Sequence, residues 1–235
     1  MTIQILISDD SDDPKASKKI KKFLKTVQNA QYLLGPQRGA VANWNSLFEK
    51  SDSDYYWFIH HDELISENIL LGLEELLKKS DKPDLIFLLY KLSKSSKVYY
   101  HSFKSIISPI LKNPKYIFLL NPFGSPSSCI FHKTLAFRYD EKLKYLVDVD
   151  LYYRQLLQSK NVYIAETEDL SVTSNLDFEN NDTRRLNLSA LLHKELHYLD
   201  LKYKQGFTKK EKMAIFILKI YHLILKKISR GIFKE

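Results

Sequence analysis

The sequence predicts an α/β protein in which a mainly parallel central sheet is flanked by helices. Two observations predict this class. Apolar strand-like runs recur along the first 165 residues, each followed by a segment with helical periodicity, and several of these runs end in polar or acidic residues. The 235-residue chain is 44% hydrophobic and 13% aromatic, which is enough apolar material for a packed core and excludes global disorder.

The first elements follow from alternation and capping patterns. Ile3, Ile5 and Ile7 alternate with other residues and predict a strand that runs into the acidic turn 8–13. Pro14 suits the first turn of a helix, which we expect to continue to Asn29. The next expected elements are a strand at 32–34, a helix at 40–50, a strand at 55–59, a helix at 66–79 and a strand at 83–90.

The second half of the chain is less regular. Residues 91–120 mix Lys, Ser and Tyr and fit strands and a surface excursion, with a helix near 106–111. The later expected elements are a loop at 121–126, a strand at 128–131, a helix at 148–159, a strand at 162–165, a polar loop at 175–187 and helices at 187–204 and 208–230. We therefore divide the chain into a main domain (1–170), a loop and helical extension (171–207) and a C-terminal helix (208–235).

Charge and cysteine content limit the possible environments. Residues 208–235 contain eight bases and two acids, a net +6, so about +2 of the total +8 is left for the rest of the chain. Because these bases accompany an apolar helix rather than an aromatic-lined groove, we do not expect nucleic-acid binding. The single cysteine, Cys129, cannot form an internal disulfide, and no secretory signal pattern opens the sequence. We expect a cytoplasmic protein.

The C-terminal helix has the pattern of an interfacial membrane helix. Its apolar stretch, 213–228, is interrupted by Lys219 and is shorter than the roughly 20 residues that span a bilayer. Lys212, Lys226 and Arg230 share one helical face with Lys219. This pattern predicts peripheral binding to an anionic membrane surface, with a core-packing or oligomer helix as the alternative.

Acidic residues occur at the end of the first predicted strand and at the start of a later predicted helix. Asp9 and Asp10 end the first strand, and they either form a turn and helix cap or accept hydrogen bonds from a nucleotide base or ribose. Asp148 and Asp150 open a later helix. They either cap it, or one of them accepts a proton from an attacking hydroxyl group.

A third cluster, residues 60–63 (His-His-Asp-Glu), follows the strand 55–59. Adjacent side chains of an extended strand point in opposite directions, so the four cannot bind one ion together. On this argument His60 and Asp62 lie on the same side and can offer an imidazole and a carboxylate to Mg²⁺ or Mn²⁺ carrying a diphosphate. The alternative is a solvated loop with Glu63 near a helix start.

The order and spacing of these motifs resemble glycosyltransferase family 2. The resemblance covers about residues 3–165. It rests on the strand ending in Asp9-Asp10-Ser11, Gly39 with Asn43-Trp44-Asn45, the strand 55–59 with its acidic end, the loop 121–127 (Asn-Pro-Phe-Gly-Ser-Pro-Ser), and the run from Phe137-Arg138-Tyr139-Asp140 to Asp148-Val149-Asp150-Leu151.

On the donor side, the resemblance implies a GT-A fold that holds a nucleotide-sugar, such as a UDP-sugar, at the carboxyl ends of the strands. Asp10 and Asp9 would contact the base and ribose, and Arg38 would reach the nucleotide or diphosphate. The Asp-x-Asp motif of the family falls on residues 60–62, so Asp62 would bind Mg²⁺ or Mn²⁺ while His60 replaces the first Asp.

On the acceptor side, the resemblance makes Asp148 the general base of an inverting transfer. The glutamate that precedes this base in the family is replaced by Val147. Gly124, Ser125 and Asp150 are expected on the acceptor side, Asp150 matching a more structural position. Family members also begin with one more strand and helix, so this chain is expected to lack a central strand and to expose the sheet edges beside it.

The implied activity is transfer of a sugar to a lipid-linked or saccharide acceptor in surface polysaccharide or glycolipid synthesis, at the inner face of the cell membrane. One alternative is a non-catalytic membrane-associated binding protein derived from such an enzyme, which His60 and the missing strand favour. The other is a sugar-nucleotide pyrophosphorylase, whose glycine-rich basic phosphate loop this sequence lacks.

Overall fold

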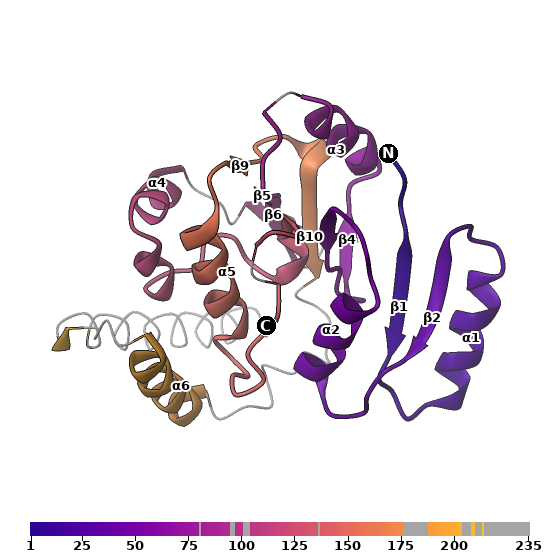
Figure 1. Ribbon diagram of the computed structural model, residues 1–235, viewed down its shortest axis with the longest axis horizontal. Helices are drawn as coiled ribbons and strands as arrows, with labels where there is room; N and C mark the ends of the chain where they lie inside the picture. The colour runs from indigo at the N-terminus through magenta and orange to yellow at the C-terminus, as the bar shows by residue number, and fades with distance from the viewer. Residues whose placement is uncertain are drawn as a thin grey trace.

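A computed structural model describes the protein over most of its length (Figure 1). The described residues are 1–79, 81–94, 97–100, 104–135, 137–175, 188–203, 208–209 and 213. The expected polar loop at 175–187 and the expected helix at 208–230 therefore lie almost entirely outside the described residues.

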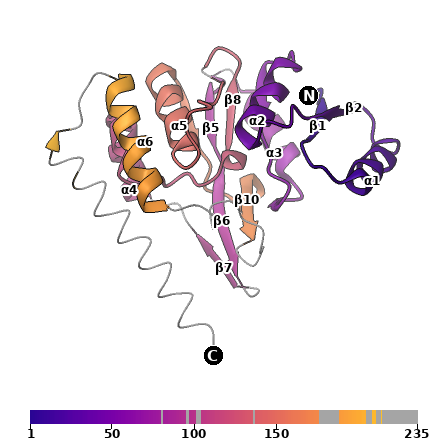
Figure 2. The same ribbon diagram turned by 90° about the horizontal axis from the view of Figure 1, so that it is seen from below.

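The N-terminal part forms a small lobe at one end of the molecule (Figures 1 and 2). Strands β1 (Ile5–Asp9) and β2 (Ala30–Leu34) pair in parallel, and helix α1 (Pro14–Leu24) connects them. The Asp13 side chain caps α1 by accepting a 2.9 Å hydrogen bond from the Lys15 N–H. The helix is five residues shorter than predicted, and Asn29 turns the chain into β2 with a φ of 57°.

The central sheet has the order β3-β8-β5-β9. Its strands are β3 (Tyr55–Trp57), β8 (Cys129–His132), β5 (Leu85–Phe87) and β9 (Val162–Ile164). β5 and β9 are parallel, whereas β8 runs antiparallel to both of its neighbours, so this sheet is mixed. Its strands are short. Every residue of β5 and the first three of β8 are buried, whereas β3 and β9 at the edges are half-buried.

A second four-stranded sheet has the order β4-β10-β6-β7. Its strands are β4 (Glu63–Ile65), β10 (Ser171–Asn175), β6 (Leu89–Lys94) and β7 (Lys97–Tyr100). The predicted strand at 83–90 is thus divided between two sheets. At the division the Leu88 N–H donates to the Ser128 carbonyl at 2.7 Å, and the chain then continues as β6. The strands β4 and β10 were not predicted.

The helices cover these sheets on both sides. They are α2 (Ala40–Glu49), α3 (Ile69–Leu77), α4 (Lys104–Lys112), α5 (Val147–Gln158) and α6 (Leu188–Tyr203). Figure 2 shows α4, α5 and α6 on one side of β5 and β6, and α2, α3 and the N-terminal lobe on the other. Within the described part of the chain, no helix is long and apolar enough to cross a membrane.

The N-terminal lobe and the central sheet do not share a strand. Among the described residues, β1 pairs only with β2, and β3 pairs only with β8. Each of these two strands therefore has an edge along which the described residues form no neighbouring strand.

Candidate active site

Four buried polar atoms in the described residues have no hydrogen-bond partner. They are His60 Nε2, Glu63 Oε2, Ser125 Oγ and Asp148 Oδ1. An unpaired buried polar atom is costly, and such atoms gather where a ligand or a reaction supplies the missing partner. Three of these residues were predicted as site residues from the sequence. We refer to the four residues together as the polar cluster.

Asp148 is held in the first turn of α5, directly after the helix begins at Val147. Burial, together with the negative charge of Glu63, raises the pKa of the Asp148 carboxyl from 3.8 to about 7. A carboxyl group with this pKa exchanges its proton near neutral pH. It therefore has the property that a general base needs.

Glu63 is the residue of the cluster that the sequence analysis missed. It lies in β4 rather than in a solvated loop near a helix start, and its side chain is only 3% exposed. The Tyr90 hydroxyl donates to Glu63 Oε1 at 3.3 Å. Burial and the charge of Glu63 both raise the pKa of Tyr90, so Tyr90 stays a hydrogen-bond donor. The pattern of an acid following an apolar strand was present, but only the pairing of β4 with β10 turns this acid inward.

The chain turns at residues 60–63, with the Glu63 N–H donating to the His60 carbonyl at 3.3 Å. Strand alternation therefore does not describe residues 60–63, because β3 ends at Trp57 rather than at Ile59. The turn instead brings His60 Nδ1 to 4.0 Å from Glu63 Oε2.

Aromatic rings surround the His60 imidazole. The rings of Trp44 and Phe58 each lie 5.2 Å from it, centroid to centroid. Burial lowers the pKa of His60, although the charges of Glu63 and Asp62 oppose this, so the imidazole is neutral at pH 7. A neutral imidazole can serve as a nitrogen ligand to a metal ion.

Asp62 lies at the mouth of this turn, half-buried, and its carboxylate makes no hydrogen bond or ion pair within the described part of the chain. No group of three or more His, Cys, Asp or Glu among the described residues is arranged to hold a metal ion. A metal at Asp62 and His60 would therefore need further oxygen ligands. The diphosphate of a donor supplies such ligands, as is usual for Mg²⁺ sites with one or two carboxylates.

The loop 121–128 closes the cluster from another side. Gly124 has a φ of +81°, and a Cβ there would collide with the Tyr90 ring, so only glycine fits this position. The Ser125 carbonyl accepts a 2.6 Å hydrogen bond from the Tyr152 hydroxyl of α5, and the Ser127 Oγ accepts one of 2.8 Å from the His60 N–H. The loop thus joins the end of β3 to the helix that carries Asp148.

The predicted nucleotide residues lie at the carboxyl end of β1. Asp9 is almost buried, and both its oxygens are engaged, one by Ser11 and the other by the Tyr32 hydroxyl at 3.1 Å. Burial opposes ionisation, but these hydrogen bonds outweigh it and lower the pKa of Asp9. Asp10 accepts from the Gln37 N–H with one oxygen, Oδ1. Arg38 is exposed on the following loop, with no hydrogen bond or ion pair to other described residues.

Gly35 allows the loop after β2 to pack closely against Asp10 and Asn43. A Cβ at Gly35 would lie 2.8 Å from Asn43 Oδ1 and closer still to Asp10. The Asn43 side chain, on α2, also accepts a hydrogen bond from Ser8 of β1. Asp10, Asn43 and the loop bearing Arg38 are therefore brought together at the carboxyl end of β1.

Helix α6 holds the start of α5 in place through Glu195. The Glu195 carboxylate is buried, 2% exposed, and accepts hydrogen bonds of 2.7–3.2 Å from the backbone N–H groups of residues 144–146. These N–H groups lie directly before the first turn of α5, and an anion here also faces the positive end of the helix dipole. No sequence pattern pointed to Glu195, because it lies about 50 residues away from the groups that it caps.

Asp150 takes part in the same contact between α5 and α6 rather than in the polar cluster. It is 0% exposed, and its Oδ1 accepts hydrogen bonds from Lys202 Nζ at 2.8 Å and the Tyr203 hydroxyl at 2.6 Å. Its Oδ2 accepts from Arg154 Nε at 3.0 Å. Residues two apart on a helix point to different sides, so Asp150 faces α6 while Asp148 faces Glu63. Asp150 therefore stabilises the contact between α5 and α6, and its hydrogen bonds do not connect it to Gly124 or Ser125.

Comparison with known proteins gives matches at the levels of family and fold. The profile of glycosyl transferase family 2 matches residues 1–143. No curated protein sequence matches the chain.

Among solved structures, residues 1–349 of TarS from S. aureus match with a TM-score of 0.63 at 13% identity, over 92% of this chain and 60% of that one. The same TarS fragment in complex with UDP matches with a TM-score of 0.60 at 14% identity, over 91% of this chain and 60% of that one. The mannosyltransferase PcManGT from Pyrobaculum calidifontis, in complex with GDP-Man and Mn²⁺, matches with a TM-score of 0.58 at 9% identity. The match covers 93% of this chain and 60% of that one. The chain thus has the GT-A fold and spans 60% of the length of these neighbours.

Proposed function

The chain belongs to glycosyl transferase family 2, and on this premise we propose that it is an inverting glycosyltransferase that uses Asp148 as its general base. The observation that carries this proposal is the position of Asp148 in the polar cluster, where burial and Glu63 raise the pKa of its carboxyl to about 7. At neutral pH a large fraction of the carboxyl is ionised, and it regains a proton readily.

The reaction is a single displacement. Asp148 takes the proton of an acceptor hydroxyl as the hydroxyl oxygen attacks the anomeric carbon of the donor sugar. The bond from this carbon to the diphosphate oxygen breaks, and its electron pair leaves with the nucleoside diphosphate. Attack from the side opposite the leaving group inverts the configuration. A positioned base contributes about 10²–10⁴-fold to such a step.

The donor that we propose is a nucleotide-sugar, in the first place a UDP-sugar. TarS has been solved with UDP and PcManGT with GDP-Man, so both bases are known among proteins of this fold. Asp10 has an oxygen left for the base or ribose, whereas Asp9 is engaged within the protein and would act by holding the turn. We assign the exposed Arg38 to the diphosphate of the donor.

Mg²⁺ or Mn²⁺ would be held by Asp62, with His60 as a second ligand and with diphosphate oxygens completing its coordination. When bound, such an ion stabilises the negative charge that develops on the leaving diphosphate. Isothermal titration of UDP, with and without Mn²⁺, tests this assignment in the wild type and in Asp62→Ala and His60→Ala. We expect Asp62→Ala to abolish metal-dependent binding and His60→Ala to weaken it. Equal binding by all three proteins would show that these residues hold no metal.

The acceptor that we propose is lipid-linked or saccharide, in the synthesis of a surface polysaccharide or glycolipid. Residues 208–235, with their net charge of +6, would hold the enzyme on the inner face of the cell membrane. Co-sedimentation of the protein with anionic vesicles, with and without residues 208–235, tests membrane binding independently of sugar transfer.

The deciding experiment is a thermal-shift screen of nucleotide-sugars with and without Mn²⁺, followed by turnover of the stabilising donor. A ligand present at 100 times its dissociation constant stabilises the fold by about 2.7 kcal/mol. The proposal expects stabilisation by one class of nucleotide-sugar and loss of transfer in Asp148→Asn. Binding of a nucleotide-sugar without any transfer would favour the non-catalytic alternative.

A further inference from the structure

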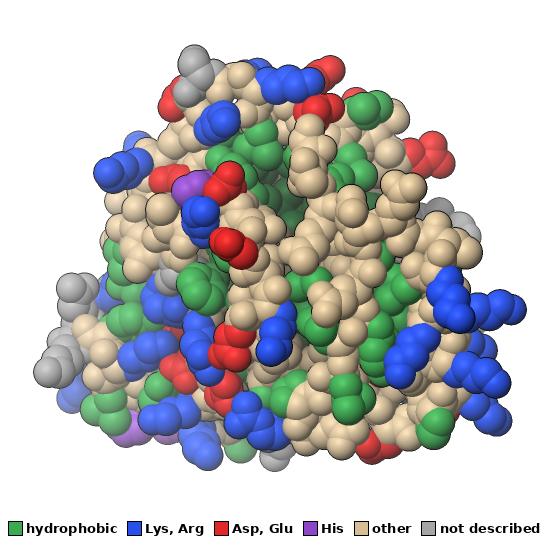
Figure 3. All heavy atoms as spheres, turned by 45° about the vertical axis from the view of Figure 1, so that its right-hand side comes forward, with side chains coloured by type: hydrophobic (Ala, Val, Ile, Leu, Met, Phe, Trp, Pro, Cys, Tyr) green, Lys and Arg blue, Asp and Glu red, His purple; other side chains and the backbone are tan. Residues whose placement is uncertain are grey.

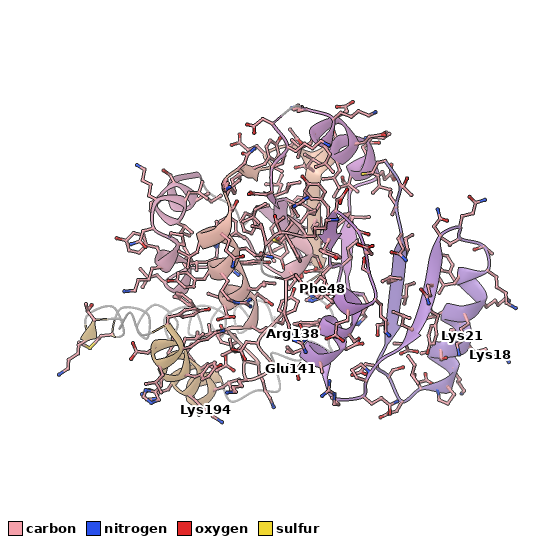
Figure 4. The ribbon with its side chains drawn as sticks, in the orientation of Figure 1. Lys18, Lys21, Phe48, Arg138, Glu141 and Lys194 are labelled. Carbon is pink, nitrogen blue, oxygen red and sulfur yellow. The ribbon has the colours of Figure 1, made fainter. Side chains whose placement is uncertain are left out.

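Helix α1 carries a concentration of positive charge that the transferase function does not use. Residues 14–25 contain no acid and six lysines, which are Lys15, Lys18, Lys19, Lys21, Lys22 and Lys25. No residue of α1 is buried, and all six lysines are exposed. Figure 3 shows lysine side chains gathered over this end of the molecule, and Figure 4 shows Lys18 and Lys21 on the outer helix of the N-terminal lobe.

Four of these lysines form a single face. Lys15, Lys18, Lys19 and Lys22 follow the i, i+3, i+4, i+7 spacing of one helical stripe. None of the four forms an ion pair within the part of the chain that the structure describes. We refer to these four residues as the lysine face.

Ile20 and Leu24 of α1 lie on the side of the helix opposite the lysine face. Ile20 and Leu24 are half-buried, and β2 is the element against which α1 packs. The lysine face therefore points away from the protein. Lys21 lies outside this face, with its Nζ 4.5 Å from the centre of the Tyr32 ring. The nearest acids, Asp12 and Asp13, precede the helix, and Asp13 is engaged in capping it.

The shape and chemistry of the lysine face fit a flat anionic surface. The eight helical residues from Lys15 to Lys22 present a straight stripe about 12 Å long. The stripe itself offers no aromatic ring for stacking bases. At its edge, Phe23 is 62% exposed, next to Lys19 on the helix surface, and an exposed aromatic ring beside lysines suits the headgroup region of a bilayer.

We propose that the lysine face of α1 docks the protein on a membrane rich in anionic lipid. This contact is separate from the one inferred for residues 208–235 and does not depend on the transferase activity. Because α1 directly follows the carboxyl end of β1, docking would hold the loop with Asp9 and Asp10 close to the membrane surface.

The test is co-sedimentation of the full chain with vesicles of phosphatidylcholine alone or with 30% phosphatidylglycerol. The variant is the triple substitution Lys15→Gln, Lys18→Gln and Lys22→Gln. A lysine close to an anionic surface contributes about fivefold to affinity, so the triple variant is expected to bind about 100-fold more weakly at low salt. Binding by the wild type should weaken as salt screens the charges.

The matched control removes three exposed lysines elsewhere, in the variant Lys50→Gln, Lys79→Gln and Lys194→Gln. It changes the net charge equally, and circular dichroism checks that both variants remain folded. An equal loss of binding in this control would show that only net charge matters and would overturn the proposal. Unchanged binding in the α1 variant would overturn it as well.

Two further arms separate the competing explanations. The triple α1 variant is also made in a chain whose C-terminal lysines Lys212, Lys219 and Lys226 are replaced by Gln, and the proposal expects the α1 substitutions to weaken binding there too. A single-stranded oligonucleotide is titrated under the same conditions. If the lysine face binds it more tightly than the vesicles, its partner is a nucleic acid and the proposal fails.

Discussion

The raised pKa of Asp148 makes a prediction about stability that needs no substrate. Folding moves this pKa from 3.8 to about 7, so the folded protein holds a proton that the unfolded chain has released between these two values. The native state then binds more protons than the unfolded state, and the free energy of unfolding falls as pH rises through this interval. About three pH units at roughly 1.4 kcal/mol each give a total penalty of about 4 kcal/mol, complete above pH 7.

The substitution Asp148→Asn removes the ionisable group and keeps its shape. We expect the variant to lack this pH-dependent penalty, so that its stability relative to the wild type improves by about 2–3 kcal/mol from pH 5 to pH 8. Urea unfolding of both proteins at the two pH values, in metal-free buffer, measures this difference. The same substitution should lower sugar transfer by about 10²–10⁴-fold because the proton acceptor is lost.

The control for this experiment is Asp52→Asn, which removes an exposed carboxylate from the loop before β3. Its unfolding free energy should follow the pH dependence of the wild type. Parallel pH profiles for the wild type and Asp148→Asn would refute the reasoning, because they would show that Asp148 ionises alike in the folded and unfolded states. If the variant gained stability but transferred sugar at the wild-type rate, the raised pKa of Asp148 would be confirmed, but Asp148 would not be the general base.

Three further predictions concern the residues around Asp148. Asp150→Asn breaks the buried contact between α5 and α6 and should lower the free energy of unfolding by about 3 kcal/mol, more than Asp148→Asn at any pH, as urea denaturation will show. Glu195→Ala leaves three backbone N–H groups without their acceptor and should lower the free energy of unfolding by about 2–3 kcal/mol. Lys194→Ala, which changes an exposed neighbour on α6, should lower it by less than about 0.5 kcal/mol, as is usual for surface substitutions. Glu63→Gln removes the charge that raises the pKa of Asp148, so the acid limb of the pH–rate profile should move to lower pH, and an unmoved limb would show that Glu63 does not act on the base.

Local patterns in the sequence determined the elements that depend on near neighbours. The alternation before Asp9 placed β1, Pro14 and the acids before it placed the start of α1, and the acids at 148–150 placed the start of α5. Each of these features is set by contacts within a few residues, such as the Asp13 side chain on the Lys15 N–H. The family and the GT-A fold followed from the order of such motifs along the chain.

The tertiary structure alone decided which of these residues meet. Glu63 turns inward because β4 pairs with β10, a strand more than 100 residues later, and the strand at 83–90 is divided because its second part joins that same sheet. Glu195 caps α5 from a helix about 50 residues away. Pairing and capping over such distances depend on where the backbone donors and acceptors of one element arrive relative to another. That placement is set by how the whole core packs, and no pattern local to the sequence contains it.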